Sequence, residues 1–305
     1  TLMIDGKLVA VRDPRGYRPL CFGRLKGGGW ALASESCALD IVGAEFTREI
    51  EPGEILILNG PEPVSRRLVP AEDPRSFCIF EYIYFSRPDS FIGGVSVDHV
   101  RRNLGKNLAR EHPTDADIVI SVPDSSNSAA MGYSEASGIP LEIGLIRNHY
   151  IGRTFIHPRQ SLRDLNVRIK YNPVADTLAG RSVVIVDDSI VRGTTSQKLM
   201  RMIREAGARE IHLRVASPPI RFPCFYGIDT PTREELIASD NDVPAIADFI
   251  GVDSLGYLSF DGLLDSVPAP RKNYCVACFD GSYPHECAFE AGLSRIGRRR
   301  IDEHC

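Results

Sequence analysis

The stretch Val183-Val-Ile-Val-Asp-Asp-Ser-Ile-Val-Arg-Gly-Thr-Thr-Ser196 decides the fold of this chain. Its first four residues form an apolar run without alternation, which is typical of a strand covered on both faces of a parallel sheet. Asp187 and Asp188 follow directly, and a polar turn with Gly193 leads into a helix that we expect to begin at Thr194. Because open α/β sheets bind ligands at the carboxyl ends of their strands, the segment predicts a binding site at that edge.

The residue types in this segment suit a phosphorylated ribose. Free backbone N–H groups at the start of the helix, with the hydroxyls of Thr194, Thr195 and Ser196, form a cradle for phosphate. The two carboxylates suit sugar hydroxyls, or a hydrated divalent ion that bridges to them. A strand, turn and helix with a simple cap would need only one acid, so capping does not account for two acids and three hydroxyl residues.

Strand and helix patterns alternate around this segment. Two helices are predicted, at 128–137 and 194–206, and further strand candidates lie at 117–122, 141–146 and 210–215. This alternation favours an α/β fold with a doubly wound parallel sheet. Residues 147–176 have weak periodicity, and a loop of that length is typical of a lid or binding element.

The beginning of the chain has a different pattern. Short apolar runs bounded by Gly, Pro, Asp and Asn are typical of strands and turns, and a Pro-rich connector follows them at 61–74. We therefore predict one domain at 1–70, a second at 71–265 and a C-terminal segment at 266–305. The chain starts at Thr1 within the β-rich pattern, so we expect an upstream part of this first domain.

Composition excludes several classes of protein. The chain is 43% hydrophobic and 25% charged, with a formal net charge of −4. A nucleic-acid binder usually has a strong basic excess, so no nucleic-acid partner is expected. No apolar stretch approaches the ~18 residues of a membrane span, and the sequence shows no secretory signal.

Two further motifs leave alternatives open. The polar turn Val122-Pro-Asp-Ser-Ser-Asn127 is either a second anion site or an ordinary helix N-cap, and the first reading requires that its strand lie beside the strand at 183–186. Eight cysteines are scattered through the chain, unlike a dense disulfide framework, which favours a cytoplasmic protein with some thiols bound to metal. Among them Cys275-Val-Ala-Cys278 is a zinc half-site, a redox pair or a chance pairing.

Together these motifs resemble the glutamine phosphoribosylpyrophosphate (PRPP) amidotransferase family. The 183–196 segment looks like its PRPP-binding signature, and Ala10–Pro19, Phe80–Asp89 and Tyr150–Ile156 are similar to other blocks of the family. The resemblance covers essentially the whole chain. It implies a type I phosphoribosyltransferase domain, preceded by the β-rich C-terminal remnant of a glutaminase domain of the N-terminal nucleophile (Ntn) type. The nucleophilic cysteine of that domain would lie upstream of Thr1.

The resemblance also implies the site residues. Catalysis would involve Asp187 and Asp188 with Arg147 and Arg153 of the predicted lid; His149 stands where the family has arginine. Mg²⁺ would be held by Asp187, Asp188 and Ser125, with Ser126 as the alternative serine. The PRPP-binding residues would be Ser125, Ser126, Asp187, Asp188, Ser189, Arg192, Gly193, Thr194, Thr195 and Ser196.

A subset of the family carries a [4Fe-4S] cluster on four cysteines, and the matching positions here are Cys78, Cys224, Cys275 and Cys278. The implied reaction is the first committed step of purine synthesis: PRPP, glutamine and water give 5-phosphoribosylamine, glutamate and pyrophosphate. This chain would keep the half that uses ammonia. The resemblance further implies feedback inhibition by purine nucleotides near Arg147 and Ser189, and a homotetramer. Two rival classes are a non-catalytic nucleotide sensor on the same fold and an iron–sulfur redox protein.

Overall fold

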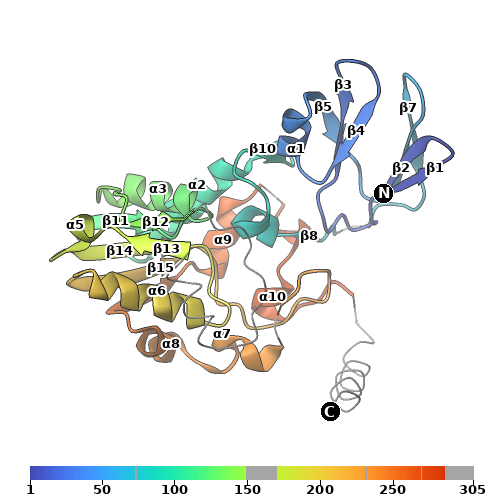
Figure 1. Ribbon diagram of the computed structural model, residues 1–305. Helices are drawn as coiled ribbons and strands as arrows, with labels where there is room; N and C mark the ends of the chain where they lie inside the picture. The colour runs from blue at the N-terminus through green and yellow to red at the C-terminus, as the bar shows by residue number, and fades with distance from the viewer. Residues whose placement is uncertain (73, 149–169, 231, 269, 286–305) are drawn as a thin grey trace, which may run out of the picture.

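The computed structural model describes residues 1–305 except 73, 149–169, 231, 269 and 286–305 (Figure 1). The chain forms a β-rich lobe from its first part and a larger α/β lobe from the rest. None of the described helices is both long enough and apolar enough to cross a membrane.

The α/β lobe is built on a parallel sheet. Its strand order is β11 (Ile118–Ser121), β14 (Ser182–Asp187), β15 (Glu210–Val215) and β16 (Ser254–Tyr257). All six residues of β14 are buried, as the unbroken apolar run predicted. The expected α/β fold with a parallel sheet is therefore confirmed.

Helices cover both faces of this sheet (Figure 1). Val184 and Val186 belong to one core cluster and Val183 and Ile185 to another, because successive strand side chains point to opposite faces. The first face is covered by α2 (Val97–Glu111), α3 (Asn127–Ser137) and α9 (Phe260–Ser266). The second face is covered by α6 (Thr194–Glu205) and α8 (Val243–Ile250). The shorter helices of the described chain include α5 (Ala175–Leu178), α7 (Ile237–Asp240), α10 (Ala277–Asp280), η2 (Arg233–Glu235) and η3 (Arg271–Asn273).

The expected strand at 141–146 is confirmed only in part. Leu141 makes a single isolated bridge to Val119, and the strand that follows, β12 (Leu145–Arg147), pairs antiparallel with β13 (Tyr171–Pro173). A Cβ on Gly144 would lie 2.6 Å from the Ile120 side chain, so the chain crosses against that side chain and does not continue alongside β11.

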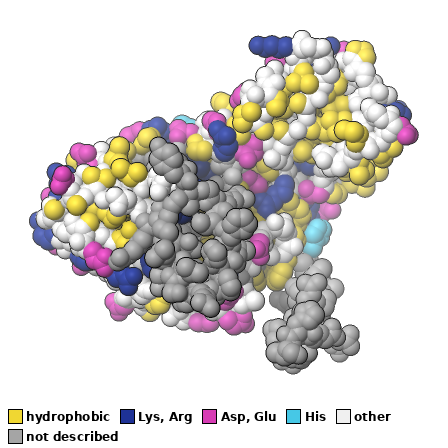
Figure 2. All heavy atoms as spheres, viewed as in Figure 1, with side chains coloured by type: hydrophobic (Ala, Val, Ile, Leu, Met, Phe, Trp, Pro, Cys, Tyr) yellow, Lys and Arg dark blue, Asp and Glu magenta, His cyan; other side chains and the backbone are white. Residues whose placement is uncertain are grey.

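The β-rich lobe contains two antiparallel sheets. One has the order β1 (Leu2–Ile4), β2 (Lys7–Val11), β6 (Glu54–Leu58) and β7 (Pro63–Arg67). The other has the order β4 (Trp30–Ala33), β3 (Cys21–Leu25) and β5 (Ala44–Glu49), beside α1 (Ser36–Ile41). Figure 2 shows apolar side chains on the surface of this lobe. Its exposed large hydrophobic residues include Leu2, Met3, Ile4, Phe46 and Val64.

The end of the described chain returns to the start of the α/β lobe. There β17 (Tyr274–Cys275) pairs in parallel with β8 (Phe77–Cys78), which is followed by a π-helix, η1 (Glu81–Phe85), and the short pair β9 (Phe91–Ile92) and β10 (Val95–Ser96). This pairing sets Cys275 directly opposite Cys78. The predicted domain limits, 1–70, 71–265 and 266–305, remain predictions.

Candidate active site

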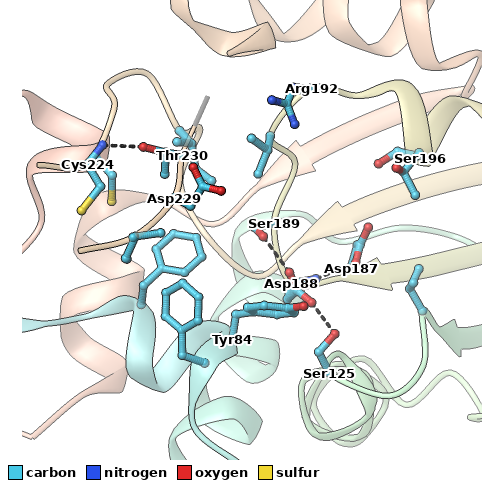
Figure 3. Close-up of a pocket in the computed structure, with 18 of the residues that line it drawn as sticks. Tyr84, Ser125, Asp187, Asp188, Ser189, Arg192, Ser196, Cys224, Asp229 and Thr230 are labelled. Carbon is cyan, nitrogen blue, oxygen red and sulfur yellow. Dashed lines mark hydrogen bonds between the residues drawn. The ribbon is translucent and has the colours of Figure 1, made fainter. Parts of the chain in front are cut away.

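Two polar turns meet at the carboxyl edge of the sheet (Figure 3). Strands β11 and β14 are parallel neighbours, and Ser121 is aligned with Val186, so the turn at 122–126 lies beside the turn at 187–193. The interpretation of residues 122–127 as a second anion site required these two strands to be neighbours, and they are. It also explains how two motifs more than 60 positions apart in the chain form one site.

The acid pair is held by serine hydroxyls from both turns. Ser125 and Ser189 each donate a hydrogen bond to the carboxylate of Asp188, the second at 2.6 Å. Ser126 is fully buried and its hydroxyl lies 3.3 Å from Oδ1 of Asp187. Both candidate serines therefore reach the acid pair, but Ser125 lines the open cavity and Ser126 lies beneath it.

Both carboxyl groups are buried, and burial is the main reason that their pKa values rise. For Asp187 the charge of Asp188 adds to the effect and lifts the pKa well above its usual value. For Asp188, hydrogen bonds from Ser125 and Ser189 and the charge of Arg101 oppose the rise in pKa. The guanidinium of Arg101 itself donates to the backbone carbonyls of Tyr82 and Ser86, at 2.8 and 2.7 Å.

The helix that follows the acid pair begins at the predicted phosphate cradle. Helix α6 begins at Thr194, as predicted, and its N-cap Gly193 has a φ of 72°, in the left-handed region that favours glycine. Thr194 and Thr195 are exposed at the mouth of the cavity, whereas Ser196 is buried. The free N–H groups of the first turn thus face the same space as the carboxylates.

Cationic side chains lie at the rim of the site. Arg147, at the end of β12, donates to Asp124 of the first turn at 2.7 Å, and Arg192 donates to Glu235 at 3.2 Å. Lys170 also lines the cavity, where burial and the charge of Arg147 lower its pKa. The predicted lid residues Arg153 and His149 lie outside the described residues.

One cavity of about 540 Å³ connects these groups. It is lined by every predicted PRPP-binding residue except Ser126. The lining residues that were not identified from the sequence include Tyr84, Lys170 and Tyr171. The only sequence signal for the last two was their position at the end of the segment with weak periodicity, which does not single out individual side chains.

The four predicted cluster cysteines also line this cavity: Cys78, Cys224, Cys275 and Cys278. All cysteines in the described part of the chain are free thiols. Burial raises the pKa of Cys78 to about 12, partly offset by the charge of Arg18, and burial also raises the pKa of Cys275 and Cys278. Within the described residues, no three Cys, His, Asp or Glu side chains are grouped closely enough to hold a single metal ion.

The fold and this site define a phosphoribosyltransferase domain: a parallel sheet with paired acids, a second polar turn and a helix N-terminus at its carboxyl edge. No protein-family model matches the chain. Two relatives, however, are each 52% identical to it over 299 residues: amidophosphoribosyltransferase 1, chloroplastic, of Arabidopsis thaliana, and the amidophosphoribosyltransferase of Bacillus subtilis.

The match extends over 98% and 97% of this chain, but the chain spans only 52% and 62% of the length of these two relatives. A solved structure of glutamine PRPP amidotransferase from B. subtilis, complexed with ADP and GMP, superposes with a TM-score of 0.84. The two sequences are 52% identical, and the matched region covers 92% of this chain and 62% of the B. subtilis chain. Along nearly its whole length, the chain is therefore homologous to part of the amidophosphoribosyltransferases.

Proposed function

We propose that this chain carries the phosphoribosyl-transfer half of an amidophosphoribosyltransferase, which converts PRPP and ammonia to 5-phosphoribosylamine and pyrophosphate. One observation carries the proposal: Asp187 and Asp188, in the turn before the N-terminus of α6, each accept a hydrogen bond from a serine of the neighbouring turn. Sugar hydroxyls or a hydrated cation at the acids and phosphate at the helix fit a single ribose phosphate.

Each part of PRPP has a partner in this arrangement. The 5-phosphate would bind the α6 N-terminus, with Gly193, Thr194, Thr195 and Ser196, and the ribose would lie over the two acids. Pyrophosphate would bind the turn at 122–126. Ser189 and Arg192 complete the rim of the site.

The acid pair suits a divalent cation. Two adjacent buried carboxyl groups with raised pKa values gain from a dication, because its charge favours their ionised forms. Asp187, Asp188 and Ser125 would hold Mg²⁺, which would neutralise charge on the departing pyrophosphate.

The protein's own groups would position the leaving group. Arg147 lies beside the turn at 122–126, where its guanidinium can donate two parallel hydrogen bonds to a phosphate. Arg153 is proposed to act with it on the basis of the sequence alone. With pyrophosphate held in this way, ammonia would attack C1 of the ribose as the C–O bond to pyrophosphate breaks.

We further propose that Cys78, Cys224, Cys275 and Cys278 bind a [4Fe-4S] cluster. They are free thiols that face one cavity from three separate segments of the chain. A tetrahedral zinc site would need sulfur atoms about 3.8 Å apart, since Zn–S bonds are about 2.3 Å long. The described residues contain no such close group, whereas a four-iron cluster binds each thiolate through a different iron, so the four sulfur atoms need not converge on one point.

For the whole protein we propose the activity of its relatives. Glutamine would supply the ammonia through an Ntn-type glutaminase domain, of which residues 1–70 would be the C-terminal part. Purine nucleotides would act as feedback inhibitors; ADP and GMP are the nucleotides bound in the B. subtilis structure. A homotetramer in the cytoplasm remains a prediction.

An assay of ammonia-dependent pyrophosphate release from PRPP, with Mg²⁺, tests the proposal. We expect activity in the wild type, loss of at least about 100-fold in Asp187→Asn, and no change in Asp248→Asn, which alters an exposed acid on α8. Binding of PRPP without pyrophosphate release in the wild type would favour the nucleotide sensor. Full activity in Asp187→Asn would show that the site is assigned wrongly.

A further inference from the structure

The β12–β13 hairpin carries Arg147 but is separate from the main sheet. In the described part of the chain its two strands pair only with each other, and Arg147 is aligned with Tyr171 across the pair. Contacts outside the sheet must therefore fix the distance between Arg147 and the turn at 122–126.

Two side chains of the hairpin contact consecutive residues of that turn. Arg147 donates to the carboxylate of Asp124 at 2.7 Å, and the hydroxyl of Tyr171 lies 3.3 Å from the backbone carbonyl of Pro123, to which it donates. The two contacts differ in their exposure to solvent. The Arg147 and Asp124 side chains are 39% and 48% exposed, so water and salt weaken their pairing.

Tyr171 is only 8% exposed and its ring packs in the core cluster beneath the hairpin, with Leu145 and Val122. Its contact is therefore the one that persists when a ligand competes for Arg147. The carbonyl that it holds belongs to the residue directly before Asp124, at the start of the turn that carries Ser125 and Ser126.

We propose that Tyr171 is a positioning residue for pyrophosphate: its hydroxyl holds the turn at 122–126 at the distance from Arg147 at which both can bind the same group. Pyrophosphate would displace Asp124 from Arg147 and leave the contact between Tyr171 and Pro123 in place. This inference rests on the proposed function, since it assumes that the turn binds the pyrophosphate of PRPP.

The chain offers a matched control in Tyr257. This tyrosine is 6% exposed, and its hydroxyl has no hydrogen-bond partner among the residues that the structure describes. Burial, followed by the charge of Asp187, raises the pKa of both phenols, so both are protonated at neutral pH. Tyr171→Phe and Tyr257→Phe thus each remove one buried hydroxyl near the same acid, but only the first removes a hydrogen bond.

The test measures kcat and KM for PRPP in the ammonia-dependent reaction, together with the inhibition constant of added pyrophosphate. We expect Tyr171→Phe to lower kcat/KM by about two- to tenfold, the range for one uncharged hydrogen bond, and to weaken pyrophosphate inhibition by a similar factor. Tyr257→Phe should change neither value. In an Arg147→Gln background the effect of Tyr171→Phe should disappear, because Tyr171 acts through the placement of that arginine.

The inference is overturned if Tyr171→Phe leaves both values unchanged, or if its effect is equally large in the Arg147→Gln background. An equal effect of Tyr257→Phe would also overturn it, since that would indicate a general response to losing a buried hydroxyl. A wild type without activity would instead refute the proposed function, so the two failures are distinguishable.

Discussion

The hydroxyl of Ser125 donates a hydrogen bond to the carboxylate of Asp188, although the two residues are 63 positions apart in the chain. This bond joins the turn after β11 to the turn after β14. The pyrophosphate side and the ribose side of the proposed site are thereby held to each other before any ligand binds.

Substitution of Ser125 tests how much this hydrogen bond contributes to kcat/KM for PRPP. We expect Ser125→Ala to lower kcat/KM for PRPP by about tenfold or more, because a hydrogen bond to a charged group contributes about 1.5–3 kcal/mol. Ser137→Ala, at an exposed position near the end of α3, serves as the control. Equal values of kcat/KM in the two variants would contradict a role for Ser125 in the site.

A comparison of alanine variants at Gly193 and Gly180 distinguishes the effect of backbone strain from an effect on ligand binding. Ala at either Gly193 or Gly180 must adopt a φ of 72°, which costs about 1–2 kcal/mol of folding free energy. A Cβ at Gly193 would also lie 2.6 Å from Cδ1 of Ile237, whereas a Cβ at Gly180 meets nothing within 4 Å. We expect both variants to lose stability in chemical denaturation, but only Gly193→Ala to raise KM for PRPP, since Gly193 caps the proposed phosphate cradle. A raised KM in Gly180→Ala would point to a global effect.

Glu54 in the β-rich lobe predicts a pH-dependent stability. Although burial opposes ionisation, hydrogen bonds from Arg48, Ser65 and the Glu51 backbone lower the pKa of Glu54 to about 2. A lowered pKa adds stability that is fully present above the unfolded-state pKa of about 4.5 and is lost as pH falls toward 2. Glu54 is 5% exposed, so Glu54→Gln should cost about 2–3 kcal/mol of unfolding free energy at pH 7.

The difference between wild type and Glu54→Gln should shrink between pH 4.5 and pH 2, as measured by denaturant unfolding at several pH values. Glu62→Gln, which changes an exposed glutamate of the same lobe, should have no comparable effect. A constant difference across this pH range would mean that the charge of Glu54 is not what stabilises the lobe.

If the four cysteines bind a cluster, substitution of one of them should remove iron from the protein, whereas substitution of another cysteine should not. Protein purified without oxygen should contain about four iron atoms per chain and absorb visible light, and Cys278→Ser should lose both properties. Cys37→Ser removes a buried thiol of the β-rich lobe that does not line the cavity, and it should keep the full iron content. Zinc in place of iron, or iron retained in Cys278→Ser, would refute the proposed cluster.

Local pattern was sufficient to predict several elements. The strand at 183–186 and the helix from Thr194 were predicted because a strand covered on both faces and an amphipathic helix each leave a periodic signature in adjacent residues. The acid pair could be identified from local sequence too, since both acids lie within seven positions of the helix start at Thr194. The segment at 141–146 was misjudged in part because its apolar residues fit a strand, whereas the contact of Gly144 with Ile120 depends on a distant part of the chain.

The sequence by itself therefore determined the α/β class, the central strand and the acidic turn of this protein. Only the tertiary structure decided that Ser125 faces the cavity while Ser126 lies beneath it, that Tyr171 reaches Pro123, and that four distant cysteines share one space. The physical reason is the distance along the chain over which the deciding interactions act. Secondary structure follows from neighbours a few positions apart, but the meeting of side chains from separate turns depends on strand register and chain crossing, which are set when the whole core packs.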